Sequence, residues 1–168
     1  PRSGPARAPA RAAVVKPVSA LPTGAVLRYG LLGLPLAFAA LPIYVHVPKL
    51  YAGELGLSLS LVGAILLATR IVDALADPLI GWASDRSASR LRLILLALPF
   101  LAVGIAGLLA PPAGAGGVWL AALLVLVTFG YSLASINHAA WGAELGTDSD
   151  SRTRLVAGRE GFGLLGVM

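Results

Sequence analysis

Cysteine is absent from this 168-residue sequence, and charged residues are scarce. Without cysteine, a disulfide framework, a thiolate metal site and a cysteine nucleophile are all excluded. Charged side chains make up 12% of the chain, whereas soluble domains usually carry about 25%. Hydrophobic residues make up 57% of the sequence, and its mean hydropathy is +0.83. This composition argues against an ordinary water-soluble fold.

The net charge of +5 does not come from one basic block or one basic face. Lysine and arginine lie between apolar segments, as topology signals of membrane proteins do, so no nucleic-acid partner is expected. The chain begins with Pro1 rather than methionine and stops at Met168 inside an apolar run. We therefore expect both ends to be cut, and the sequence to be a fragment of a longer protein.

Long apolar segments account for most of the chain. Residues 1–22 are rich in Pro, Ala and Arg and predict a disordered tail, which leaves residues 23–168 as a transmembrane bundle. A membrane-spanning helix needs roughly 20 mostly apolar residues, and residues 25–47, 58–82, 92–110 and 118–141 meet that length. A fifth segment, residues 155–168, is truncated.

Short connectors separate these segments. They contain helix breakers and occupy residues 48–57, 84–91, 111–117 and 142–154, and Ser58 is the expected N-cap of the second helix. The sequence predicts an all-α, polytopic membrane helix bundle.

The distribution of basic residues predicts the orientation of the bundle. Ten fall on one side of the membrane: Arg2, Arg7, Arg11, Lys16, Arg28, Arg86, Arg90, Arg92, Arg152 and Arg154. The loops of the opposite side contain Lys49 alone. Because basic loops stay in the cytoplasm, we expect a multi-pass inner-membrane protein with a cytoplasmic N-terminus.

The second helix contains three charged residues, Arg70, Asp73 and Asp77. At about 100° per residue they fall within an arc of roughly 60°. Each charge costs about 2.5 to 3.5 kcal/mol at mid-membrane, so this face must contact protein or water. One interpretation is an Arg70–Asp73 pair that only holds helices together, but it leaves Asp77 without an evident partner. Two carboxylates spaced i,i+4 repel when both are ionised and favour a proton or a cation. We therefore expect Asp73 and Asp77 to bind a coupling ion, sodium or a proton.

The end of the second helix and the loop after it contain Gly81, Asp85, Arg86 and Arg90. It is either a basic topology signal or a cytoplasmic gate. In the second interpretation Gly81 permits close approach of helices, and the three charged residues form ion pairs that break when two halves of a protein rock.

Helix four ends with polar and aromatic residues. Asn137 and Trp141 are i,i+4 neighbours on one face, and an amide beside an indole binds polyols by hydrogen bonding and stacking. Tryptophan at a helix end is also a frequent interfacial anchor. His138 and His46 are interpreted as membrane-interface histidines.

Enzyme chemistry is not expected. The sequence has no Ser/His/Asp constellation and no cluster of metal ligands, so no cofactor other than the coupling ion is expected. Gly161, Gly163 and Gly166 match the G-x-G-x-x-G spacing of dinucleotide sites, but no strand precedes them. We interpret these glycines as small residues for helix packing.

Several of these features together resemble one transporter family. They are Tyr29-Gly30, Arg70, Asp73, Asp77-Pro78, the loop from Gly81 to Arg90, and Trp141. The sequence resembles the glycoside-pentoside-hexuronide:cation symporters, the melibiose permease-like branch of the major facilitator superfamily, over residues 26–163. The most specific part of the resemblance is residues 68–81.

The resemblance implies twelve helices in two six-helix bundles, with solute and cation sites between them and alternating access by rocking. The present chain would supply four complete helices and the start of a fifth from the N-terminal half, and the missing C-terminal half would be its partner. By position, Asp73 and Asp77 match the family's cation-binding carboxylates. Arg159 resembles the fifth-helix arginine near the sugar pocket.

Three departures from the family pattern concern the solute. Ala76 replaces a frequent asparagine, while Ala37 and Asn137 replace acidic sugar-binding residues. The expected function is cation-coupled symport of a sugar or similar small solute, bound near Asn137, Trp141 and Arg159. The alternatives are a proton-coupled or facilitative carrier of a non-sugar, for example lipid-like, solute, and a non-transporting membrane scaffold.

Overall fold

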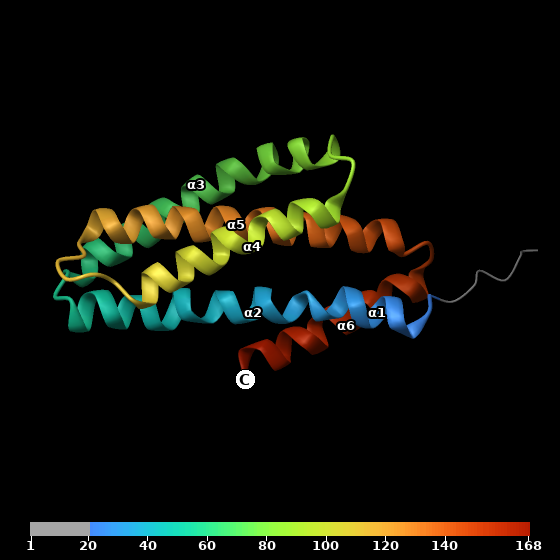
Figure 1. Ribbon diagram of the computed structural model, residues 1–168, viewed down its shortest axis with the longest axis horizontal. Helices are drawn as coiled ribbons and strands as arrows, with labels where there is room; N and C mark the ends of the chain where they lie inside the picture. Colours follow the sequence, from blue (N-terminus) through green and yellow to red (C-terminus); the bar gives the residue numbers. More distant parts are fainter. Residues whose placement is uncertain (1–20) are drawn as a thin grey trace, which may run out of the picture.

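The computed structural model describes residues 21–168, and among these residues it contains helices and no β-strand (Figure 1). The elements are α1 (Thr23–Leu31), α2 (Gly33–Leu41), π-helix η1 (Pro42–His46), π-helix η2 (Lys49–Glu54), α3 (Leu59–Asp85), α4 (Arg90–Leu109), α5 (Gly117–Leu145) and α6 (Ser149–Val167). The predicted all-α class is confirmed. The predicted disordered tail falls almost entirely on residues 1–20, which lie outside the described part of the chain.

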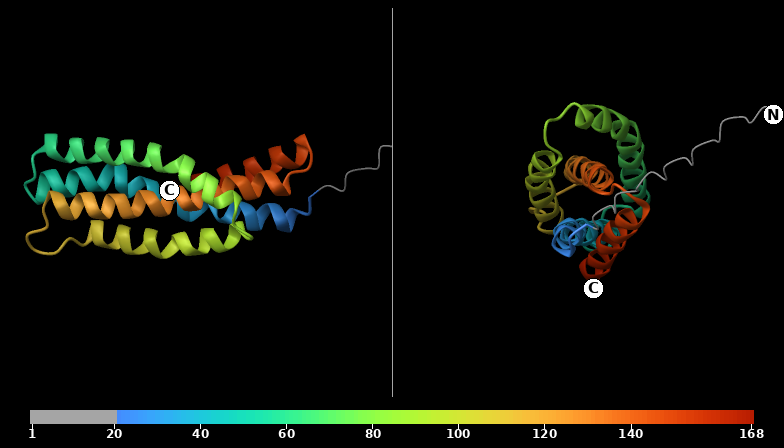
Figure 2. Two further views of the ribbon diagram at one scale, coloured as in Figure 1. Left: turned by 90° about the horizontal axis from the view of Figure 1, so that it is seen from above. Right: turned by 90° about the vertical axis from the view of Figure 1, so that its right-hand side faces the viewer.

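Within residues 21–168, four helical segments are long and apolar enough to cross a membrane. The first, from Thr23 to Glu54 and called the first span below, combines α1, α2, η1 and η2; the others are α3, α4 and α5. The start of α1, the α3–α4 loop and the α5–α6 loop lie at one end of the bundle (Figure 1). Seen end-on, α5 lies in the middle of the other helices (Figure 2).

Helix ends differ from the sequence prediction at two connectors. Residues 48–54 were predicted as a connector but are helical, because Pro48 keeps an α-region backbone (φ −59°, ψ −43°) and the chain continues in π-helical turns. Residues 142–154 are also mostly helical. There Asp148 caps α6 by accepting a hydrogen bond from the Ser151 N–H at 2.8 Å. Hydrogen bonds from the side chain and backbone of Ser151 lower the pKa of Asp148. The predicted Ser58 cap of α3 is confirmed, since its Oγ accepts the Leu61 N–H.

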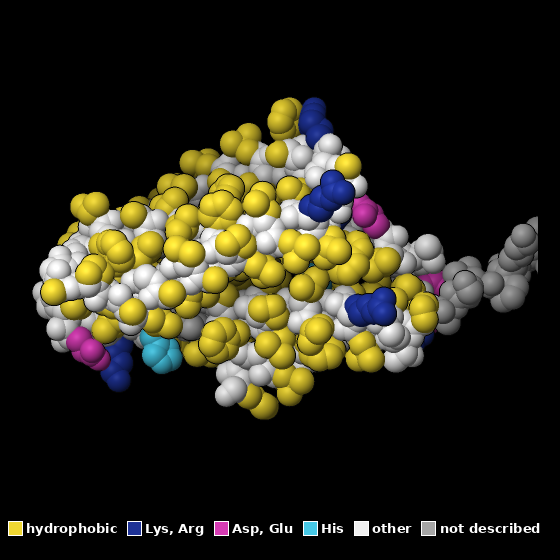
Figure 3. All heavy atoms as spheres, viewed as in Figure 1, with side chains coloured by type: hydrophobic (Ala, Val, Ile, Leu, Met, Phe, Trp, Pro, Cys, Tyr) yellow, Lys and Arg dark blue, Asp and Glu magenta, His cyan; other side chains and the backbone are white. Residues whose placement is uncertain are grey.

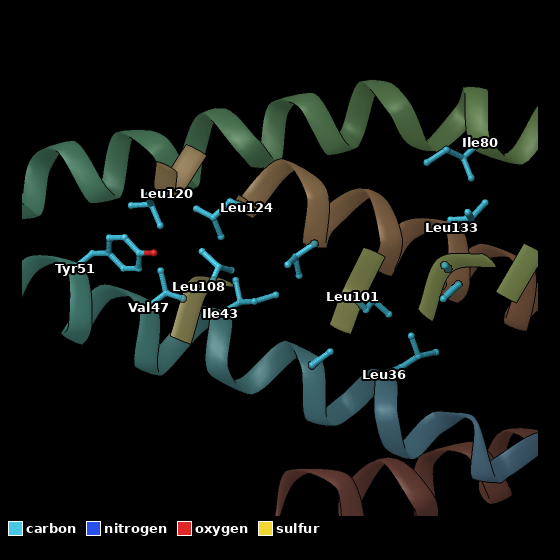
Figure 4. Close-up of a cluster of buried hydrophobic side chains, with 14 of the residues drawn as sticks. Leu36, Ile43, Val47, Tyr51, Ile80, Leu101, Leu108, Leu120, Leu124 and Leu133 are labelled. Carbon is cyan, nitrogen blue, oxygen red and sulfur yellow. The ribbon is translucent and has the colours of Figure 1, made fainter. Parts of the chain in front are cut away.

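The buried core runs along the contact of the first span, α4 and α5 (Figure 4). It includes Leu36, Ile43, Val47 and Tyr51 of the first span, Leu101 and Leu108 of α4, and Leu120, Leu124 and Leu133 of α5. The outer surface is also largely apolar, and the charged side chains gather toward the two ends (Figure 3). Such a surface suits lipid, because a water-soluble bundle would cover its outer faces with polar residues.

Glycines set the closest helix contacts. A Cβ at Gly104 of α4 would collide with Val127 of α5, and one at Gly130 would lie 3.0 Å from Phe100 Cβ and 3.2 Å from Ala97 O. On the opposite side, a Cβ at Gly166 of α6 would meet the backbone of Leu34, which agrees with the packing role predicted for that glycine. Small residues therefore let helix backbones approach each other, as is usual in membranes.

We predict that Gly130→Ala destabilises the full-length protein by about 1–3 kcal/mol, because the added methyl meets backbone atoms of α4 that cannot rotate away. Gly63→Ala is the matched control, since a Cβ there finds nothing within 4 Å among the described residues. The control should be neutral, or stabilising by up to about 1 kcal/mol through helix propensity. Thermal unfolding of both variants in detergent measures the difference, and equal midpoints would contradict the close α4–α5 contact.

Candidate functional site

Asp73 of α3 lies between a cation and a hydroxyl group. Its Oδ2 is 3.2 Å from the Arg70 guanidinium on the same helix, and its Oδ1 accepts a hydrogen bond from Ser132 Oγ of α5 at 2.7 Å. The Asp73 side chain is only 13% exposed. The Arg70–Asp73 pair considered from the sequence is thus present, and Ser132, which the sequence did not single out, adds a bond between two helices.

Asp77 lies one turn further along α3. Its Oδ1 is one of two buried side-chain oxygen or nitrogen atoms without a hydrogen-bond partner among the described residues, the other being Tyr51 Oη. A carboxylate oxygen that is removed from water and has no donor is a suitable ligand for a cation. Pro78 has no N–H, so the carbonyl of Ala74 also lacks its usual intrahelical donor. Asp77 thus offers a buried carboxylate oxygen that no hydrogen-bond donor of the described residues occupies.

Monovalent and other hard cations prefer such oxygen ligands. The carboxylates of Asp73 and Asp77 with the hydroxyl of Ser132 fit this requirement. Within residues 21–168, no group of three His, Cys, Asp or Glu side chains gathers as a transition metal would require.

Arg70 has a second neighbour on the first span. Its guanidinium carbon lies 4.9 Å from the centre of the Tyr44 ring, within η1, a distance at which a cation and an aromatic face attract each other. Both residues line an apolar cavity of about 170 Å³ between η1, α3 and α5. Arg70 therefore connects the first span with Asp73.

A polar network closes the end of the bundle at the α3–α4 loop. Its centre is Arg90, which donates to Asp85 Oδ1 at 2.9 Å and to Glu144 Oε1 at 3.1 Å. Arg90 also donates to Ser84 Oγ, which in turn donates to Asn137 Oδ1. The network joins α3, α4 and α5. Glu144 was missed because the sequence prediction ended its helix at residue 141.

Two of the predicted gate residues lie outside this network. The Arg86 guanidinium stacks on the Trp82 ring at 3.6 Å and donates to the Trp82 carbonyl. Gly81 was expected to permit close helix approach. That expectation is wrong for the described part of the chain, because a Cβ at Gly81 would find no atom within 4 Å.

The three residues predicted to bind solute lie in different places. Asn137 is fully buried in the polar network, where its Nδ2 also donates to Leu133 O at 2.7 Å. Trp141 packs near Tyr29, with ring centres 5.7 Å apart, and lines a cavity beside Arg90 and Glu144. Arg159 lines a separate cavity on the other side of α5. The structure therefore does not bring the three side chains together.

The cavity beside Arg159 has a volume of about 270 Å³. Its polar lining consists of Tyr131, Ser135 and His138 of α5 and of Arg159 and Glu160 of α6. Ala37, the position where an acidic residue was expected by resemblance, lies in the same lining. The Arg159 guanidinium pairs with Glu160 Oε1 at 2.7 Å. This cavity combines hydroxyl groups, an imidazole and one ion pair, which are suitable hydrogen-bonding partners for a small polar molecule.

His138 is not the interfacial residue that the sequence suggested. It is 1% exposed, its ring lies 4.2 Å from the Tyr29 ring, and its Nε2 lies 2.9 Å from the Tyr29 carbonyl oxygen. Because a carbonyl only accepts hydrogen bonds, Nε2 carries the proton when the ring is neutral, and Nδ1 is left as an acceptor. His46, by contrast, is exposed.

Comparison with known proteins adds the family. No solved structure matches this chain. The family model described as MFS/sugar transport protein matches residues 27–168, which covers almost all of the described helices. With four helices among residues 21–168 that are long and apolar enough to span a membrane, the chain belongs to the MFS/sugar transport protein family, a family of membrane transporters in the major facilitator superfamily.

Proposed function

We propose that this chain is the N-terminal part of a secondary active transporter that couples a monovalent cation to a small solute, a sugar or a similar polar molecule. The observation that carries the proposal is the buried, unpartnered Asp77 Oδ1 one turn from the ion-paired Asp73. Transport by the family supports the general activity. The melibiose permease-like branch is the proposed subfamily.

A cation acts on the α3 carboxylates by relieving their mutual repulsion. The oxygen ligands proposed for the cation are the carboxylates of Asp73 and Asp77, the Ser132 hydroxyl and the carbonyl of Ala74. Binding draws the Asp73 carboxylate away from Arg70, so the arginine has to change its contacts. The ion also carries charge, and the membrane potential adds about 2.3 kcal/mol per charge per 100 mV to its entry.

The solute binds, in this proposal, in the cavity lined by Arg159, Tyr131, Ser135 and His138. The cavity is smaller than a typical ligand site of about 300–1,000 Å³, which suits a chain that supplies only one side of the site. The missing C-terminal half would supply the other side, and rocking of the two halves would expose the site alternately to each face of the membrane.

Replacing either carboxylate tests the coupling. We predict that Asp73→Asn and Asp77→Asn each abolish gradient-driven accumulation in vesicles that contain the full-length protein, because the amide keeps the shape but removes the charge that attracts the ion. Labelled sugars are scanned against imposed sodium and proton gradients. Asp150→Asn, an exposed residue in the first turn of α6, is the matched control and should accumulate solute as the wild type does.

The other outcomes separate the alternatives. A facilitative carrier would show uptake that equilibrates without accumulation and that neither substitution changes. In that case the two aspartates would serve only in contacts between helices. Accumulation of lipid-like solutes but of no sugar would support cation coupling and would reject a sugar or similar polar molecule as the solute. Absence of any transport by the full-length protein would favour a membrane scaffold.

The solute cavity makes a separate prediction. Arg159→Gln should raise the KM for solute about tenfold or more, because it removes the charged hydrogen-bond donor from the cavity. Asn137→Ala should instead lower stability by about 1–3 kcal/mol, since Ser84 loses its buried acceptor, and should leave KM nearly unchanged. Arg154→Gln, in the second turn of α6 and outside the cavity, is the control for loss of charge. If Asn137→Ala instead raised KM strongly and left stability normal, Asn137 would bind solute as the sequence predicted.

The proposed location is the inner membrane, with the α3–α4 and α5–α6 loops in the cytoplasm. Basic residues support this orientation, because Arg86, Arg90, Arg152 and Arg154 lie at that end of the bundle while the opposite loops contain Lys49. A reporter inserted after Ala88 should therefore be cytoplasmic, and one inserted after Ala113 should be on the opposite side. The reverse result would overturn the orientation without affecting the family.

A further inference from the structure

We infer that Tyr44 is a positioning residue that stabilises the cation-bound state by accepting Arg70 when the cation takes Asp73, and that this contact draws η1 toward α3. The inference rests on the proposed function, because it requires a cation at Asp73. It assigns to the first span a role in stabilising the cation-bound state. Neither the positions of the charged residues nor the family match indicates such a role.

The starting geometry places Arg70 between two partners. Its Nη1 is 3.2 Å from Asp73 Oδ2, and its guanidinium carbon is 4.9 Å from the centre of the Tyr44 ring. Among residues 21–168, Asp73 is the carboxylate that pairs with Arg70. The Arg70 side chain is 43% exposed, so it has room to shift between these partners.

The Tyr44 ring matters more after the cation binds than before. An arginine paired with a carboxylate already has its charge compensated, so the ring adds little. Once the cation occupies Asp73, the guanidinium needs another partner, because an unpaired arginine is unfavourable within a membrane. The nearby aromatic face is such a partner. A contact that is stronger in one state than in the other shifts the equilibrium toward that state.

The backbone around Tyr44 is suited to movement. η1 begins at Pro42, and Pro48 separates it from η2; neither proline has an N–H to donate to the helical ladder. Both segments are π-helical, a geometry that occurs mostly as single turns and frequently at functional sites. The cavity of about 170 Å³ between Tyr44 and α3 leaves room for η1 to approach. Attraction between Arg70 and the ring would reduce this cavity.

A substitution series at Tyr44 in the full-length transporter tests the inference. The measured quantity is the sodium concentration that gives half-maximal uptake at saturating solute. Tyr44→Leu should raise it about two- to fivefold, the factor that corresponds to a cation–π contact at a partly exposed site. Tyr44→Phe keeps the aromatic face and should match the wild type, whereas Tyr44→Trp should lower the value. The maximal rate should change less than the half-saturating concentration.

A second measurement follows the movement itself. These 168 residues contain no cysteine, so Val45→Cys adds the first thiol of this part of the transporter, beside Tyr44 on an exposed position of η1. Sodium alone should change the rate at which a membrane-impermeant maleimide labels this thiol, and Tyr44→Leu should remove the change. The same protein with Val45 intact measures labelling of any cysteine elsewhere in the transporter.

The outcomes distinguish this inference from the function on which it rests. If sodium drives wild-type uptake but the half-saturating concentration follows side-chain size rather than the aromatic face, the role of Tyr44 is rejected and the coupling site stands. Sodium-independent labelling of the cysteine at position 45 would reject the movement of η1. If sodium does not drive wild-type uptake at all, sodium coupling at Asp73 fails, and the inference fails with it.

Discussion

The contact between α3 and α5 is the constraint on which the rest of the structure depends. Charged and polar side chains of α3 are too costly to expose to lipid, at about 2.5–3.5 kcal/mol for each charge near mid-membrane. The helix therefore turns Asp73 and Ser84 toward α5, where Ser132 donates a hydrogen bond to Asp73 and Asn137 accepts one from Ser84. The same rotation leaves apolar residues such as Leu75 and Leu79 on the outer surface of the described helices.

Once α3 is fixed against α5, the position of α4 follows from two further contacts. Arg90, at the first turn of α4, reaches both Asp85 of α3 and Glu144 of α5, so the three helices are joined at one end. Toward the other end, the missing side chains of Gly104 and Gly130 let α4 lie directly against α5. The ion pairs of Arg90 thus set the orientation of α4, and close packing at the glycines sets its distance from α5.

Much of this arrangement was predictable from sequence, and the exceptions have physical reasons. Segment length and hydropathy predicted the four spans, and the spacing of Arg70, Asp73 and Asp77 predicted their common face. Helix ends were less accurate, because the cap at Asp148 and the helical backbone at Pro48 depend on local geometry. Contacts between distant segments were missed altogether. Ser132, Glu144 and Tyr44 carry no sequence motif, and only the packing of the helices places them beside Asp73, Arg90 and Arg70.

The central helix α5 gives the two candidate sites a physical connection. Ser132 bonds to Asp73 on one face, while Tyr131 and Ser135, on neighbouring turns, line the cavity beside Arg159 on another. An α-helix moves as a nearly rigid rod over such short distances, since its backbone hydrogen bonds resist local deformation. In the proposed function, a cation that changes the Asp73–Ser132 bond would therefore act on the walls of the proposed solute cavity through a single helix. Coupling of the two ligands then requires no long chain of intermediates, only that occupied and empty states of Asp73 favour different positions of α5.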